Sequence, residues 1–101
     1  MATKDAKDDD NSIYIGNKPF MNYVTGVVVQ FTSKGAKEVI IKGRGKFISR
    51  AVDVAEVVTH RFLKGQTAIG DIAIDSEEFQ NDEGQTIRVS TIEITLKQTK
   101  K

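Results

Sequence analysis

Apolar side chains recur at intervals of three or four residues between positions 20 and 32. This spacing predicts a helix that packs one face against a core. Pro19 fits the first helical turn, where its missing N–H costs no hydrogen bond, and Gly35 suits the stop after the helix. The apolar positions are Phe20, Val24, Val27, Val28 and Phe31.

A second helix is predicted from Ser49, a good N-cap residue, to about Leu63. Its apolar positions occupy more of the helix surface than one sheet would cover. The excess favours a second buried surface, most simply a dimer interface; an unusually buried helix in a monomer is the alternative. The positions are Ala51, Val52, Val54, Ala55, Val57, Val58, Phe62 and Leu63.

Four segments have the pattern of strands. The first is residues 13–15, and the second is residues 38–42, whose Val39, Ile40 and Ile41 are expected to be buried on both faces. In residues 67–75 and 90–97, apolar and polar side chains alternate, with Ile72 and Ile74 in the earlier segment.

A polar segment, residues 76–88, connects the last two strands and contains the turn sequence Asn81-Asp82-Glu83-Gly84. The strands lose their apolar face there, so we expect a hairpin arm of about 15 Å beyond the sheet, at roughly 3.3 Å per residue. Without core contacts, the arm should be mobile. The predicted fold is α+β: a β-α-β-α-β-β two-layer sandwich with both helices on one face of a four-stranded mixed sheet.

The 101 residues suffice for one domain, predicted at residues 12–98. Residues 1–11 are predicted to be a disordered acidic tail that aids solubility, or else binds a metal or competes with phosphate; residues 99–101 form a C-terminal tail. No apolar run approaches the roughly 20 residues of a membrane span, and no signal peptide opens the chain. The absence of cysteine excludes disulfides and thiolate chemistry, and we expect a cytoplasmic protein.

The net charge is only +1, but it is unevenly distributed. Two lysines against four aspartates give residues 1–10 a net charge of −2, which leaves +3 on the rest. Lys42, Arg44 and Lys46 alternate with Gly43 and Gly45 between the second strand and the second helix. Glycines permit positive φ and a close backbone approach to a ligand, and the cations suit phosphate. The loop predicts a polyanion site; a solvated turn is the alternative.

Lys18 lies where the first strand leads into the first helix. A lysine and the N-terminal amides of a helix can share one phosphate. An ordinary exposed lysine is the other interpretation.

Few residues suit catalysis or metal binding. His60 is the only histidine, and a plain surface histidine is its simplest interpretation. The basic loop lacks the lysine-serine or lysine-threonine of nucleotide-binding loops. Carboxylates near the hairpin are more typical of a solvated face than of a divalent-ion site; they are Asp71, Asp75, Glu77, Glu78, Asp82 and Glu83. We predict no enzyme, no cofactor and no metal site.

Several stretches, in order, resemble the Alba family of archaeal chromatin proteins between about residues 12 and 97. They are IGNKP at residues 15–19, MNYV at 21–24, EVIIKGRGK at 38–46, ISRAVDVAE at 48–56, RFL at 61–63 and RVSTIEI at 88–94. The resemblance implies a homodimer of the fold described above. It also implies a chromosome-associated protein that binds double-stranded DNA, and in many relatives RNA, with little sequence preference.

The resemblance also implies particular contacts. Lys18, Arg44 and Lys46, with Lys42 close by, would touch backbone phosphates from the centre of the dimer. The arms, here residues 79–88 with Asn81 and Arg88, would follow the minor grooves. Phe62 matches a position used for contacts between neighbouring dimers on DNA; an ordinary core phenylalanine is the alternative.

Two departures from the family pattern are expected to weaken DNA binding. Asn17 replaces a second lysine that many relatives carry beside the proline turn, which removes a phosphate contact and an acetylation site used in some of them. The arm carries four acidic side chains against Arg88 alone. We therefore expect lower affinity and a shallower salt slope than in a more basic relative, since each phosphate contact adds about 0.9 to that slope.

The main alternative to a role in DNA packaging is a role as an RNA-binding protein or as a subunit of an RNA-processing complex. The resemblance implies this alternative too, because some relatives use the same fold for it. Tyr14, Tyr23 and the five phenylalanines mostly occupy core spacings. This pattern argues against binding single strands by stacking.

Overall fold

The computed structural model describes residues 11–99, and both tail predictions lie mostly outside this range. The elements are β2 (Ser12–Tyr14), α1 (Phe20–Thr32), β3 (Glu38–Arg44), α2 (Ile48–Val57), β4 (Thr67–Gln80) and β5 (Thr86–Gln98). A 3-10 turn, Gly45–Phe47, precedes α2, and a π-helical turn, Val58–Phe62, extends it. The element order confirms the prediction.

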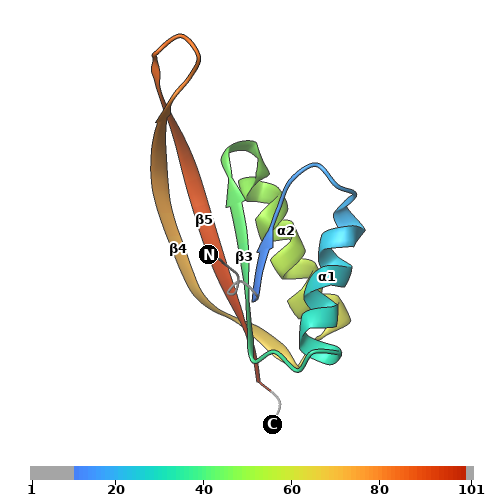
Figure 1. Cartoon of the computed structure of the whole chain (residues 1–101). Helices are drawn as coiled ribbons and strands as arrows, with labels where there is room; N and C mark the ends of the chain where they lie inside the picture. The colour runs from blue at the N-terminus through green and yellow to red at the C-terminus, as the bar shows by residue number, and fades with distance from the viewer. Residues whose placement is uncertain (1–10, 100–101) are drawn as a thin grey trace.

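The strands form one mixed sheet in the order β2-β3-β5-β4. The edge strand β2 runs parallel to β3, and the other pairs are antiparallel. Both helices lie on the same side of the sheet (Figure 1). The predicted two-layer fold is therefore confirmed.

The core lies between the sheet and the helices. Val39 and Ile41 of β3 face Leu96 and Ile94 of β5, and all four are buried. The helices contribute the apolar face that their spacing predicts, through Tyr23, Val24, Val27, Phe31, Ala51, Val54, Ala55 and Val58. Ile40 points to the opposite face and is only half-buried. The prediction that this strand is buried on both faces was wrong, because the helices cover only one face.

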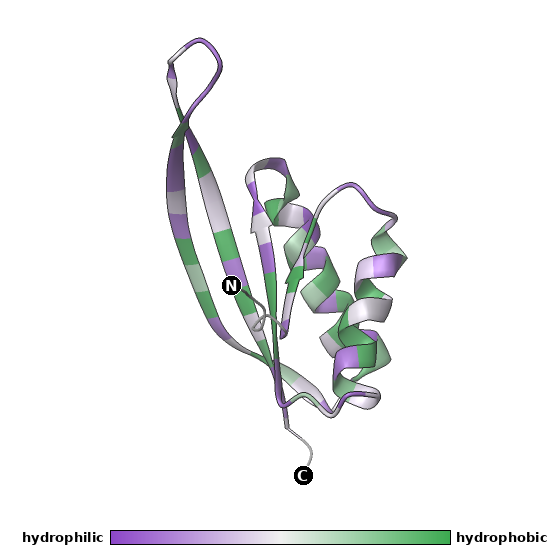
Figure 2. Ribbon diagram, in the orientation of Figure 1, coloured by the Kyte–Doolittle hydropathy of each residue, from purple (hydrophilic) through white to green (hydrophobic). Residues whose placement is uncertain are grey.

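The hairpin arm extends well beyond the rest of the sheet. The last pair between β3 and β5 is Arg44 with Thr91, whereas β4 and β5 continue for five more pairs, from Ser76 with Ser90 to Gln80 with Thr86. This length agrees with the predicted arm, and it helps to give the molecule a long axis of 50 Å. Figure 2 shows that the tip is mainly hydrophilic.

Within residues 11–99, no helix has both the length and the apolar character needed to cross a membrane.

Candidate nucleic-acid interface

Hydrogen bonds from its backbone N–H groups hold the loop that carries Lys18 against the core. The Ile15 N–H donates to the Lys42 carbonyl oxygen over 2.9 Å. The Tyr23 hydroxyl accepts from the N–H groups of Gly16 and Lys18, at 2.9 and 3.0 Å. Because Tyr23 is buried, the backbone of Lys18 is fixed while its side chain stays in solvent.

Arg50 of α2 joins this loop, although the sequence analysis did not include it among the binding residues. Its Nη1 donates to the Lys18 carbonyl oxygen over 3.0 Å. Arg50 follows Lys46 by four residues, about one helical turn, and that spacing was the available signal. The 15–19 loop and the Gly45–Phe47 turn lie at the same end of the molecule (Figure 1). We call this end, with Lys18, Lys46 and Arg50, the body end.

Strand β3 continues to Arg44, two residues beyond its expected end at Lys42, so Arg44 belongs to the strand as Lys42 does. Both point to the open face of the sheet, opposite the helices, because the alternate residues Val39, Ile41 and Gly43 are buried. They are therefore presented by a hydrogen-bonded strand, not by a mobile turn.

Lys42 and Arg44 both lie beside a carboxylate and an aromatic ring. The Lys42 Nζ is 3.6 Å from Glu93 and 5.4 Å from the centre of the Tyr14 ring. The Arg44 guanidinium is 3.2 Å from Glu77, and its centre lies 5.8 Å from that of the Phe79 ring. These cations are thus partly neutralised before any ligand arrives.

The two glycines of the basic segment have different roles, and the predicted positive φ is found at one of them. A Cβ on Gly43 would lie 2.9 Å from both the Ala51 Cβ and the Phe47 carbonyl oxygen, so Gly43 permits close packing of β3 against the start of α2. Of these two glycines, Gly45 has the predicted positive φ, at 57°.

The N-cap prediction for Ser49 was wrong. The helix begins at Ile48, with Phe47 in the cap position and no side-chain cap hydrogen bond. The 3-10 turn continues directly into the helix, with the Ile48 N–H donating to Gly45, so the first turn needs no serine. Lys46, on that turn, is exposed, with its Nζ 5.4 Å from the centre of the Phe47 ring.

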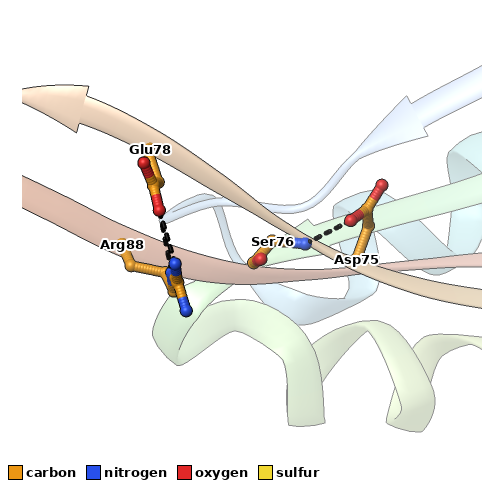
Figure 3. A network of polar contacts seen from close by, with 4 residues as sticks. All are labelled: Asp75, Ser76, Glu78 and Arg88. Carbon is orange, nitrogen blue, oxygen red and sulfur yellow. Dashed lines mark hydrogen bonds and ion pairs between the residues drawn. The ribbon is translucent and has the colours of Figure 1, made fainter.

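Asn81 lies at the turn of the hairpin arm, whereas Arg88 is nearer the body end, because a Cβ on Gly45 would lie 3.4 Å from the side chain of its neighbour Val89. Arg88 pairs with Glu78 on the facing strand, and Asp75 accepts from the Ser76 N–H (Figure 3). Asn81 builds the turn, because its side-chain oxygen accepts from the N–H groups of Glu83 and Gln85, at 3.0 and 2.9 Å.

The remaining sequence candidates lie elsewhere. Phe62, in the π-helical turn, is 51% exposed, so the interpretation as an ordinary core phenylalanine was wrong. His60 is exposed, with its Nε2 3.2 Å from Glu56. Within residues 11–99, no group of three histidine or carboxylate side chains is placed to hold a metal ion.

Comparison with known proteins gives a consistent picture. Residues 11–76 match the Alba family. The DNA/RNA-binding protein Alba of Methanocella arvoryzae is 57% identical over 89 residues, covering 88% of this chain and 91% of the relative. Its counterpart in Nanoarchaeum equitans is 60% identical over 85 residues, covering 83% and 93% of the two chains.

A solved structure of similar fold is Alba from Thermoplasma volcanium. Its TM-score is 0.78 at 48% identity, and the match covers 86% of this chain and 99% of that one. The sequence and structural matches both span nearly the whole relative. The chain therefore belongs to the Alba family.

Proposed function

We propose that the protein binds double-stranded DNA as a homodimer, largely without sequence preference, and coats chromosomal DNA in the cytoplasm. The observation that carries the proposal is the body end, where the exposed Lys18 sits on backbone held by hydrogen bonds to Tyr23 and Arg50. Relatives named DNA/RNA-binding proteins support it. The role is binding without catalysis.

Phosphate contact, not base reading, suits these side chains. Lys18, Lys46 and Arg50 offer positive charge, which fixes a protein on nucleic acid but carries no sequence information. Lys42 and Arg44 would add contacts from the open sheet face. The arm, with Asn81 and Arg88, would follow the minor groove, and Asn17 would lie beside the backbone.

The homodimer is supported by apolar side chains that the monomer leaves uncovered. Ile69, Ile72 and Ile74 of β4 lie opposite Leu96, Ile94 and Ile92 of the core, so they share the helix side of the sheet. Their exposures are 36%, 58% and 78%.

Helix α2 adds Val52, 38% exposed, to this surface. Val52 lies about 200° around the helix from Arg50, whose side chain reaches the Lys18 carbonyl in the loop before α1. Exposed apolar surface of this kind marks an interface.

The dimer interface is tested by changing its most exposed apolar side chain. Ile74→Asp places a charge in the proposed interface and should convert the dimer to a monomer of 11.2 kDa in sedimentation experiments. Ala73→Asp is the matched control, since Ala73 faces the other side of the strand. A wild-type protein that sediments as a monomer would refute the dimer.

Phe62 is proposed to contact a neighbouring dimer on DNA, and its exposure makes it accessible for that role. Phe62→Ala should preserve the affinity for a short duplex while reducing cooperative coverage of long DNA. Unchanged cooperativity would remove Phe62 from the proposal.

The ion pairs support the expectation of weak binding. Lys42, Arg44 and Arg88 each lie against a carboxylate, and a phosphate has to compete with that partner. We therefore propose lower affinity at physiological salt than in a relative with a basic arm and a lysine in place of Asn17.

The test is a competition titration of matched DNA and RNA duplexes between about 50 and 200 mM salt, where phosphate-driven binding falls steeply. The double variant Arg44→Ala, Lys46→Ala should weaken binding equally for all sequences and reduce the salt slope by about 1.8 per subunit, or about 3.6 for the dimer. Lys34→Ala is the control, because this exposed lysine follows α1, at the opposite end of the molecule (Figure 1).

An unchanged affinity in the double variant would contradict the proposed site. Preference for the RNA duplex would assign the same residues to RNA handling instead of DNA packaging. No binding to either duplex would refute the function.

A further inference from the structure

The open face of the sheet carries a hollow beside the proposed phosphate contacts. It has a volume of about 310 Å³, close to the lower limit of about 300 Å³ for small-molecule sites. Its polar lining includes Lys42, Arg44, Glu77 and Glu93, with Tyr14 as its aromatic wall. These side chains come from four different strands, so the hollow depends on the assembled sheet.

Tyr14 is unusually exposed for a ring of its size, at 69%. It lies beside Lys42 in the sheet, on the face that no helix covers. The expectation that the tyrosines and phenylalanines occupy core positions was therefore wrong for Tyr14, and Phe79 in the arm is also 45% exposed. The reason is that β2 is a short edge strand whose outward face has no covering layer.

Tyr14 also lines a second hollow, of about 570 Å³, between β2 and α1. Lys18 and Asn22 line that hollow with it. Tyr14 is the residue common to both hollows, with Lys18 in one and Lys42 and Arg44 in the other. An exposed aromatic ring flanked by cations is the arrangement that binds single-stranded nucleic acid, since bases stack on the ring and phosphates follow the cations.

The carboxylates indicate which part of a nucleotide enters the smaller hollow. Its two cations are matched by Glu77 and Glu93, so it has no net positive charge with which to attract a phosphate. Ionised carboxylates only accept hydrogen bonds, and the amino and imino groups of unpaired bases donate them. The hollow therefore fits a neutral base better than a phosphate.

We propose that Tyr14 stacks against an unpaired base of single-stranded nucleic acid, which enters the smaller hollow beside Lys42 and Arg44, while Lys18 in the other hollow holds a flanking phosphate. The inference rests on the proposed function, because it uses the same cations. It adds a ligand class that duplex binding does not require, since the bases of a duplex are stacked on one another.

The test compares a single strand of about 12 nucleotides, within the usual site size, with the duplex of the same sequence. The single strand contains 2-aminopurine, whose fluorescence falls when it stacks. Tyr14→Ala should weaken single-strand binding by about 5- to 150-fold, the effect of losing one stacked base, and should abolish the fluorescence change. Duplex affinity should stay within about twofold of wild type.

Tyr14→Phe keeps the ring and should retain single-strand binding. Val29→Ala, which shortens an exposed apolar side chain of α1, is the control for truncation alone, and a thermal melt checks that each variant is folded. Unchanged single-strand affinity in Tyr14→Ala, or an equal loss for strand and duplex, would overturn the stacking site. If wild type bound the duplex but not the single strand, only this inference would fail; if it bound neither, the proposed function would fail as well.

Discussion

The body end and the hairpin arm are both expected to touch nucleic acid, yet they are built differently. The loop of Lys18 is held by Tyr23, a buried side chain from another element. In the arm, every β4 residue from Ser76 to Gln80 is exposed, and the turn is held by its own Asn81. The body end is therefore preorganised by the core, whereas the arm depends on hydrogen bonds between its two strands.

The electrostatics of the two regions differ in the same direction. Within residues 11–99, neither Lys18 nor Lys46 lies within ion-pair distance of a carboxylate. Arg88 is paired with Glu78 inside the arm, and Glu77 of the arm reaches Arg44 on β3 of the same sheet. Carboxylates of the arm thus partly neutralise Arg88 and Arg44, whereas Lys18 and Lys46 at the body end keep their full charge.

The largest expected difference between the regions is in stability. Ile41→Ala removes a fully buried side chain of the body and should lower the free energy of unfolding by about 2–5 kcal/mol. Ile87→Ala removes a half-buried partner of Phe79 in the arm and should cost at most about 1 kcal/mol.

Urea denaturation of both variants at one protein concentration measures these values, because dimer stability depends on concentration. Equal losses would show that the arm is as well packed as the body and would contradict the distinction between them.

The body was easier to predict than the site because its signals are local. Apolar spacing located α1 at residues 20–32, and the turn sequence at residues 81–84 located the hairpin. The start of α2 at Ile48 depends instead on the preceding 3-10 turn. No residue pattern predicted that turn. Similarly, Gly43 is needed for contact with Ala51, a residue of another element.

The partners of the site residues depend on strand register. Lys42 meets Glu93 because β3 and β5 pair in one particular alignment. Arg44 reaches across β5 to Glu77 on β4. Sequence alone identified Lys42, Arg44 and Glu77 but neither Glu93 as a partner nor the pairing, since the register comes from packing of the whole sheet.

The two regions should also differ in what holds their loops. Tyr23→Phe removes the hydroxyl that accepts two N–H groups at the body end, and it should lower the free energy of unfolding by about 1–3 kcal/mol. Asn81→Ala removes the corresponding acceptor in the exposed arm turn, where water can replace it, and should cost about 0.5–1 kcal/mol.

Hydrogen exchange of the Gly16 and Lys18 amides checks the first of these effects directly. Tyr23→Phe should accelerate their exchange, and Asn81→Ala should leave it unchanged. Unaltered exchange in Tyr23→Phe would show that the hydroxyl does not fix the loop.

The smallest expected effect concerns the ion pair that links the regions. Glu77→Gln removes the carboxylate 3.2 Å from Arg44 and should tighten duplex binding by up to about fivefold, because an exposed pair of this kind is worth at most about 1 kcal/mol. Glu83→Gln makes the same charge change at the arm turn and is the control. Equal tightening in both variants would mean that the arm weakens binding only through its total charge, whereas a larger effect of Glu77→Gln would show that Glu77 competes with phosphate for Arg44.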